Sequence, residues 1–125
     1  MTRSDANNGS YILNFESFNN VYNFIRRFVE RTKSMVQTLL FTISSESDDY
    51  AETEDALETL EFAVFSSLRR VDVSTRYSSR QLIVILMEAD EAGCERVAQR
   101  IISCFSGICK NPSIHVKYDI ARMEG

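Results

Sequence analysis

The sequence lacks the paired cysteines that staple small secreted folds. Its three cysteines, Cys94, Cys104 and Cys109, are an odd number without a close pair, and the chain holds a single histidine. This argues against a disulfide framework and against a zinc site, because each needs several such side chains at short spacing. We therefore expect free thiols in a reducing compartment, so the predicted localisation is cytoplasmic.

Long apolar runs and a basic excess are also missing. The longest apolar run, Leu82 to Met87, is far shorter than the roughly 20 residues that span a bilayer. Residues 1–10 are polar and lack the apolar core of a signal peptide. The formal net charge of -4 supplies no basic field to attract nucleic acid or an anionic lipid surface. We expect neither a nucleic-acid partner nor a membrane partner.

The sequence shows no arrangement typical of nucleophilic catalysis. No serine, cysteine or lysine stands beside a recognisable base. His115 alternates with Ile114 and Val116, so we expect it to face solvent. The acidic run at 46–49 is expected to be a solvated loop rather than a cation site.

The composition is that of one soluble domain. The chain has 125 residues, of which 44% are apolar and 26% charged, and these values suit a single globular core. Residues 1–12 contain few large apolar side chains and are predicted to form a flexible leader. Residues 13–125 are predicted to form the domain.

The hydrophobic pattern predicts a helix followed by the order β-α-β-β-α-β. The expected elements are a helix from Phe18 to about Lys33, a strand over 36–44, a helix from Thr53 to about Arg69, strands over 71–77 and 80–87, a helix from Asp90 to about Phe105, and a strand over 113–120. This order indicates an α+β, ferredoxin-like fold: a four-stranded antiparallel sheet with two helices on one face. The N-terminal helix is expected on the other face, because two strands are apolar throughout.

The hairpin segment carries a family resemblance. Arg69 to Leu86 reads RRVDVSTRYSSRQLIVIL, which resembles the stretch of GGDEF (diguanylate cyclase) domains where RRSDxxARY is followed by GGDEF and an apolar strand. The downstream segments DEAGCERVAQRI and SIHVKYDI are similar to the family's next helix and strand, and LLFTIS to its first strand. The resemblance implies the nucleotide cyclase fold and a place in bacterial cyclic di-GMP signalling.

The signature segment departs from the family where the chemistry would be. Ser78, Ser79, Arg80, Gln81 and Leu82 stand where the family has Gly-Gly-Asp-Glu-Phe. The resemblance implies that Gln81 replaces a metal-binding Glu, and that Arg80 puts a cation in place of an Asp. The two serines replace glycines that allow positive φ and close approach of a nucleotide.

Two further parts of the family's site are missing. The acids of the family's first strand fall at Thr42 and Ser44. Only one helix fits between Thr53 and Arg69, where active members have room for two. Hard divalent cations require oxygen anions, so these degenerate positions are expected to bind no metal, and no cofactor is expected.

An Arg-x-x-Asp motif survives five residues before the signature segment. Arg69 and Asp72 stand where the family often binds cyclic di-GMP, and their side chains suit phosphate and guanine. The two residues could instead have a purely structural role, because Arg is favourable at a helix C-terminus and Asp often caps turns. Asp72 could also pair with Arg76 across the hairpin.

The sequence thus predicts a non-catalytic GGDEF-like signalling or interaction module, and not an enzyme. Apolar side chains beyond the needs of one core, at Phe24, Phe62 and Phe65, favour a homodimer or a partner signalling domain. The alternatives are a cyclic di-GMP receptor using Arg69 and Asp72, an active diguanylate cyclase, or an ordinary ferredoxin-like module that binds RNA or a small molecule.

Overall fold

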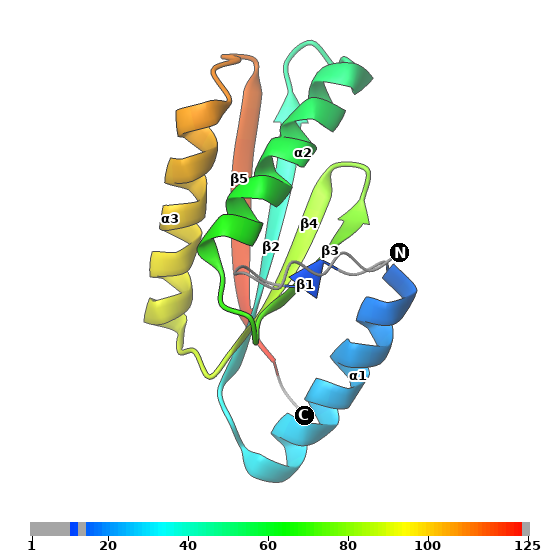
Figure 1. Ribbon diagram of the computed structural model, residues 1–125, viewed down its shortest axis with the longest axis vertical. Coiled ribbons are helices and arrows are strands. Elements are labelled where there is room, and N and C mark those ends of the chain that lie inside the picture. Colours follow the sequence, from blue (N-terminus) through cyan, green and yellow to red (C-terminus); the bar gives the residue numbers. More distant parts are fainter. Residues whose placement is uncertain (1–10, 13–14, 124–125) are drawn as a thin grey trace.

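The computed structural model describes residues 11–12 and 15–123. The described elements, in chain order, are β1 (Tyr11–Ile12), α1 (Phe15–Thr32), β2 (Val36–Ser45), α2 (Tyr50–Ser67), β3 (Val73–Ser78), β4 (Gln81–Met87), α3 (Glu91–Ile108) and β5 (Ile114–Arg122) (Figure 1). From α1 onward this is the predicted order. Most of the predicted flexible leader, residues 1–10, lies outside the described residues, and its last two residues form β1.

One sheet holds every described strand, in the order β1-β3-β4-β2-β5. Strands β2, β3, β4 and β5 pair antiparallel with one another, so the predicted α+β ferredoxin-like arrangement is confirmed. The short strand β1 adds a parallel edge beside β3. Two residues are too few to show a strand period in the sequence, so β1 could not be predicted.

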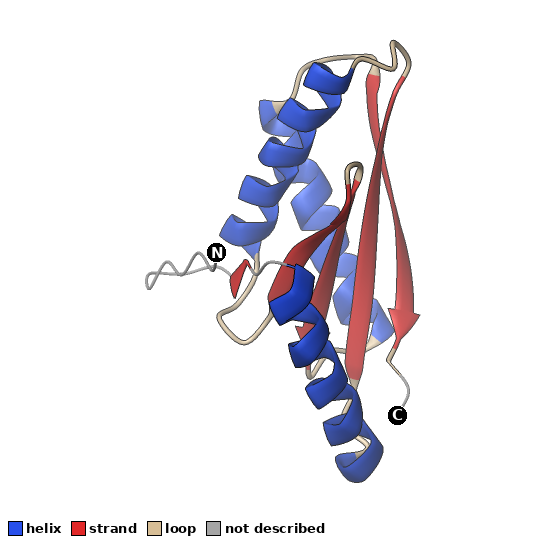
Figure 2. Ribbon diagram, turned by 90° about the vertical axis from the view of Figure 1, so that its right-hand side faces the viewer, coloured by secondary structure: helices blue, strands red, loops and turns tan. Residues whose placement is uncertain are grey.

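The sheet carries an apolar core on each face. Along β4, Leu82, Val84 and Leu86 belong to the core under α2 and α3, whereas Ile83, Ile85 and Met87 belong to the core under α1. Successive strand residues point to opposite faces, which is why this strand is apolar without alternation. The predicted place of the N-terminal helix is therefore confirmed. In Figure 2, α1 is the lowest helix and lies apart from the other two.

The start of α2 differs from the prediction. Asp49, not Thr53, is the N-cap, and its carboxylate accepts a hydrogen bond from the Ala51 amide at 2.8 Å. Thr53 lies inside the helix, 2% exposed, and donates to the Asp49 carbonyl oxygen. Both residues are common N-caps, so the sequence alone did not decide between them. For α3, the predicted cap Asp90 is confirmed and accepts from the Gly93 amide at 2.7 Å.

Strand β5 forms the other edge of the sheet and alternates as predicted. Ile114 is buried, and Val116 and Tyr118 pack against the core under α2 and α3. His115 points away from that core and lies 2.6 Å from the Glu46 carboxylate. None of the helices described is both long and apolar enough to cross a bilayer.

Candidate functional site

The signature segment forms the tip of the β3–β4 hairpin. The turn residues are Ser79 and Arg80, one position later than the sequence pattern predicted, because Ser78 still pairs with Gln81 across the ladder. A register shift between Arg76 and Ser78 absorbs the extra residue. The Ser78 hydroxyl donates to the Gln81 amide oxygen at 3.0 Å and accepts from the Arg80 amide. The tip is therefore closed by its own side chains.

Two of the degenerate metal positions meet at this tip. Thr42 of β2 lies opposite Gln81 in the ladder, and the Gln81 amide nitrogen donates to the Thr42 hydroxyl at 3.2 Å. Ser44 lies two residues further along β2, opposite His115, and is exposed. Leu82, the last signature residue, is buried in the core under α2 and α3. The structure thus joins Thr42 to Gln81 and leaves Ser44 outside their contact.

The charges at the tip do not suit a divalent metal. Arg80 reaches from the turn to the loop after β2 and forms an ion pair with the Asp48 carboxylate. Gln81 and Thr42 offer neutral oxygens, and these are weak ligands for a hard cation compared with carboxylates. Among residues 11–12 and 15–123, no three His, Cys, Asp or Glu side chains cluster in a way that could hold a metal ion. The tip does not fit the metal that the resemblance implies.

The acidic loop after β2 has a different partner for each of its acids. Asp48 pairs with Arg80, Asp49 caps α2, and Glu46 contacts His115. The loop is exposed to solvent as expected, with the side chains of Asp48 and Glu46 78% and 68% accessible, but each acid also has a defined partner. The sequence could not show this, because each partner comes from a distant part of the chain or from local cap geometry.

Glu52, in the first turn of α2, joins this loop to the turn that precedes β5. Its carboxylate accepts hydrogen bonds from the hydroxyls of Ser47 at 2.8 Å, Ser113 at 3.1 Å and Ser45 at 3.2 Å. The hydrogen bond from Ser47, followed by those from Asn111, Ser113 and Ser45, lowers the pKa of the Glu52 carboxyl group. Sequence reasoning missed this residue, whose only signal was the density of serines on either side of the loop.

The Arg-x-x-Asp motif forms the turn between α2 and β3, at the other end of the hairpin. Asp72 is 1% exposed, and its carboxylate accepts from the backbone amides of Arg69 at 3.1 Å and Met87 at 3.0 Å. The Arg69 guanidinium lies 3.3 Å from the same carboxylate and also donates to the Met87 carbonyl oxygen. Arg76, the other expected partner of Asp72, instead pairs with Glu54 and Glu61 of α2.

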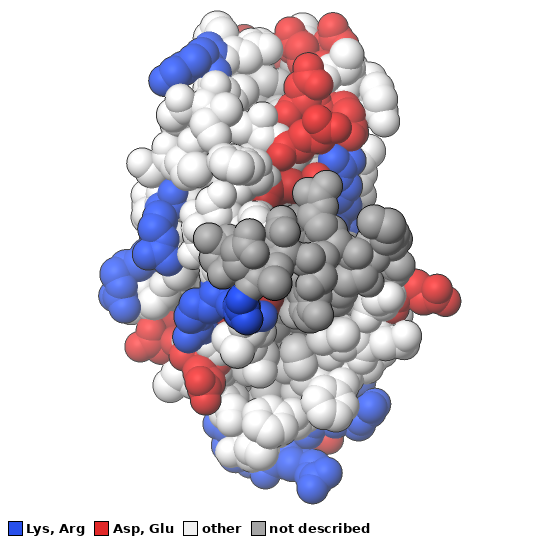
Figure 3. Space-filling view, viewed as in Figure 1, with Lys and Arg blue, Asp and Glu red and all other residues white. Residues whose placement is uncertain are grey.

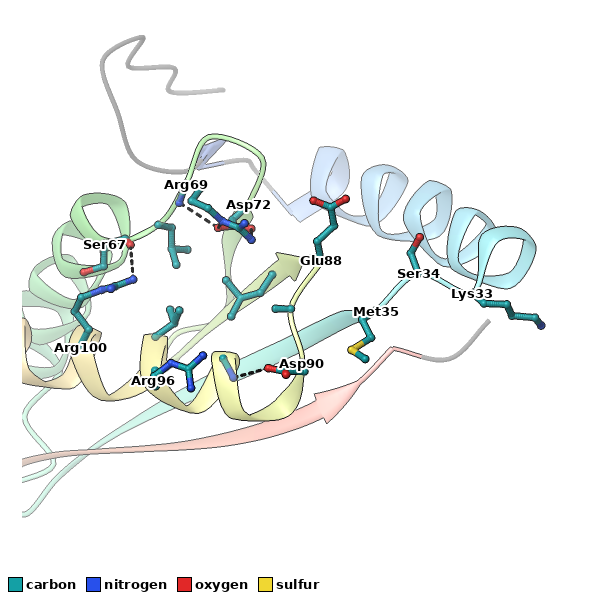
Figure 4. Close-up of a pocket in the computed structure, with 15 residues that line it drawn as sticks. Lys33, Ser34, Met35, Ser67, Arg69, Asp72, Glu88, Asp90, Arg96 and Arg100 are labelled. Atoms are coloured by element: carbon teal, nitrogen blue, oxygen red, sulfur yellow. Dashed lines mark hydrogen bonds and ion pairs between the residues drawn. The ribbon is translucent and has the colours of Figure 1, made fainter.

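A cleft of about 750 Å³ opens beside this turn. Figure 4 shows Arg69 on one side, and Arg96 and Arg100 of α3 on the other. Arg100 donates to the Ser67 carbonyl oxygen at 3.3 Å, which joins α3 to the end of α2. Three acids also line the cleft: Asp72 is paired with Arg69, Asp90 is engaged as the α3 cap, and Glu88 is exposed. The accessible guanidinium groups can bind an anion.

Arg96 and Arg100 were not among the predicted site residues. They stand four apart on α3, so they share one face of that helix. Lys33, from the connection between α1 and β2, also lines the cleft. The spacing of the two arginines was visible in the sequence, but their approach to Arg69 follows from the packing of α3 against α2.

The sequence and the fold compare differently with known proteins. No family model matches the sequence, and no curated protein matches it. The active GGEEF domain of a diguanylate cyclase from Vibrio cholerae matches the fold with a TM-score of 0.72, at 13% identity over 90% of this chain and 77% of that one. Diguanylate cyclase SiaD from Pseudomonas aeruginosa, in complex with its activator SiaC, also matches with a TM-score of 0.72, at 12% identity.

The match to SiaD covers 87% of this chain and 46% of that chain, so this chain spans about half the length of SiaD. The GGDEF domain of DgcB from Caulobacter crescentus, in complex with c-di-GMP, matches with a TM-score of 0.67, at 12% identity over 98% of this chain and 78% of that one. The chain therefore has the fold of the GGDEF domains of diguanylate cyclases.

Proposed function

We infer that this protein is a non-catalytic GGDEF-like module that acts by binding in cyclic-dinucleotide signalling. The observation that carries this proposal is the hairpin tip, where Thr42 and Gln81 hydrogen-bond to each other and Arg80 pairs with Asp48. Joining two GTP molecules needs divalent metal to neutralise phosphate charge and to activate a hydroxyl nucleophile. A tip made of an amide, hydroxyls and a guanidinium cannot hold that metal.

The preserved core supports a role in binding. Each face of the sheet carries a cluster of buried apolar side chains, while the residues at the signature positions differ from the family's Gly-Gly-Asp-Glu-Phe. On the surface, Phe24 and Phe62 are 63% and 57% exposed. Aromatic side chains at such exposure are typical of protein contacts. The proposed partner is a second copy of the chain or a partner signalling domain, and SiaD, of the same fold, is known in complex with an activator protein.

Turnover of GTP tests this proposal. The protein is incubated with GTP and Mg²⁺ or Mn²⁺, and the nucleotides are separated by chromatography. We expect no linear or cyclic dinucleotide above the level of a buffer control. Formation of cyclic di-GMP that is lost on Gln81→Ala would contradict the proposal, because it would place productive metal chemistry at the tip.

The second candidate function is a cyclic di-GMP receptor, favoured by the arginine-lined cleft. Arg69, Arg96 and Arg100 converge on it, and guanidinium groups bind phosphates bidentately. The Asp72 carboxylate is buried and already accepts hydrogen bonds from two backbone amides and the Arg69 guanidinium, so in this proposal it orients Arg69 while the guanidinium groups contact the ligand.

Isothermal titration with cyclic di-GMP tests the receptor function. Binding should weaken at least about tenfold in Arg69→Ala and in Arg100→Ala, and remain unchanged in Lys117→Ala on the distant strand β5. The absence of heat at high micromolar ligand, or equal affinity in all variants, would exclude this cleft as a receptor site.

We also propose a cytoplasmic location. Cys94, Cys104 and Cys109 are all free thiols, which suits a reducing compartment. Fractionation of cells that express the protein at native level checks this, and recovery from the periplasm would contradict it.

A further inference from the structure

The outward side of α1 carries an aromatic and basic surface. Phe24 and Phe28 are 63% and 42% exposed, and they line a hollow of about 380 Å³ together with Arg27 and Arg31. The spacing i, i+3, i+4, i+7 puts these four residues on one side of the helix. Within the described part of the chain, neither arginine takes part in an ion pair. We call these four residues the α1 face.

Helix α2 carries a surface of the opposite charge. Its sequence contains several acids and no basic residue. Asp55 and Glu58 are exposed, and neither forms an ion pair with any described residue. Phe62, 57% exposed, and the half-buried Phe65 follow on the same side of the helix. We call these four residues the α2 face.

The two faces match when the helices run antiparallel. On α1 the aromatic Phe24 precedes the cation Arg31 by seven residues, and on α2 the acid Asp55 precedes the aromatic Phe62 by seven. Seven helical residues span about 10 Å. Antiparallel contact therefore sets the aromatic rings against one another and the arginines against the acids.

We propose that the α1 face binds the α2 face of a second copy of this chain. The charge and spacing that complement the α1 face occur on this same molecule, whereas within one copy α1 packs against β3 and α2 against α3. Figure 3 shows acidic side chains gathered over α2 and basic ones around the lower end of α1, in one view. Two copies related by a twofold axis can therefore make both contacts and close into a dimer.

This inference rests on the proposed binding role and specifies its partner. The aromatic rings supply most of the affinity, because they remove apolar surface from water. The opposed charges fix the antiparallel orientation and speed the encounter. Association should therefore weaken between 0.05 and about 0.5 M NaCl, as the screening length shortens.

A charge-swap experiment tests the contact. Variant one carries Arg27→Glu and Arg31→Glu, so both of its faces are acidic. Variant two carries Asp55→Arg and Glu58→Arg, so both of its faces are basic. Each is measured alone and in an equimolar mixture by sedimentation equilibrium, with circular dichroism to confirm folding. A control with Lys110→Glu and Lys117→Glu makes the same change in net charge as variant one, away from both faces.

The wild type and the control should dimerise, each variant alone should dimerise more than about tenfold more weakly, and the mixture should recover the dimer. A wild type that stays monomeric at about 1 mM would overturn the inference, even if it sedimented with phosphatidylserine vesicles. Variants that dimerise as well as the wild type would also overturn it. None of these results depends on GTP turnover, so failure here leaves the non-catalytic proposal separately testable.

Discussion

The two ends of the β3–β4 hairpin differ in how charged side chains are used. At the tip, Gln81 and Thr42 are neutral and Arg80 neutralises Asp48. At the base, Asp72 is buried and organises two backbone amides and a guanidinium. An acid is thus kept where the folded backbone depends on it, and is absent where only a bound metal would need it. The comparison separates residues that maintain the fold from residues that would perform chemistry.

The largest expected effect comes from restoring anions at the tip. The quadruple variant Thr42→Asp, Ser44→Asp, Arg80→Asp and Gln81→Glu supplies hard oxygen ligands and removes the cation. It should bind Mn²⁺ with a dissociation constant on the order of 10⁻⁴ to 10⁻³ M, measured by titration calorimetry.

The matched control carries Lys110→Asp and Arg122→Asp, which add a similar negative charge; Arg122 lies opposite Gln37, at the far end of β2 from Thr42. The control should bind no Mn²⁺ at a defined site. If the quadruple variant binds no better than the control, then charge alone does not decide whether the hairpin tip holds a metal.

The next largest effect concerns the base of the hairpin. Asp72→Ala leaves the buried amides of Arg69 and Met87 without acceptors, at about 1–3 kcal/mol for each unsatisfied group. We expect urea unfolding to show a loss of about 3 kcal/mol, against less than about 0.5 kcal/mol for Ser78→Ala at the exposed tip. Equal losses of unfolding free energy in Asp72→Ala and Ser78→Ala would contradict the different roles given to the base and the tip of the hairpin.

A smaller effect is expected midway along the hairpin, at Arg76. Its guanidinium contacts Glu61 at 3.0 Å and Glu54 at 2.9 Å, with its side chain 35% exposed. The hydrogen bond to Glu61, and then that to Glu54, raises the pKa of Arg76 and keeps it charged. Solvent screens such a pair, so Arg76→Gln should cost about 1 kcal/mol in urea unfolding. Arg76→Lys should recover part of that loss, and no loss in either variant would refute the link.

The smallest effect is a pH dependence at Glu52. Hydrogen bonds from serines depress its pKa in the folded protein below the ordinary value of 4.5. The stabilisation is therefore present above about pH 4.5 and is lost as pH falls through the lower folded value. Glu52→Gln should make the unfolding free energy less dependent on pH in that acidic range. An unchanged slope would show that the serine contacts contribute nothing.

Much of this architecture could be predicted from local pattern. The apolar run QLIVILM identified a central strand covered on both faces, and Asp90 marked the start of α3. The pattern could not decide between competing local signals: both Asp49 and Thr53 are suitable caps for α2, and the structure has Asp49. The hairpin turn shifted by one residue because Ser78 continues the ladder.

The contacts at the candidate sites depend even more on long-range packing than the elements do. The sequence left open whether Thr42 and Gln81 converge, and the register of β2 against β4 places them opposite each other. The partners of Arg76, and the approach of Arg96 and Arg100 to Arg69, depend on how α2 and α3 pack. Long-range pairings of this kind are not encoded in any short segment, so a single sequence does not reveal them.

Direct observation of Mn²⁺ in the presence of GTP tests the central claim. Free Mn²⁺ is followed by electron paramagnetic resonance as wild-type protein is added to a fixed Mn²⁺ and GTP mixture. We predict that the free-ion signal stays at the level set by GTP alone, because Gln81 and Thr42 are neutral and the carboxylate described at the tip, that of Asp48, is paired with Arg80. A saturable, protein-dependent loss of the signal that disappears in Gln81→Ala would contradict the account.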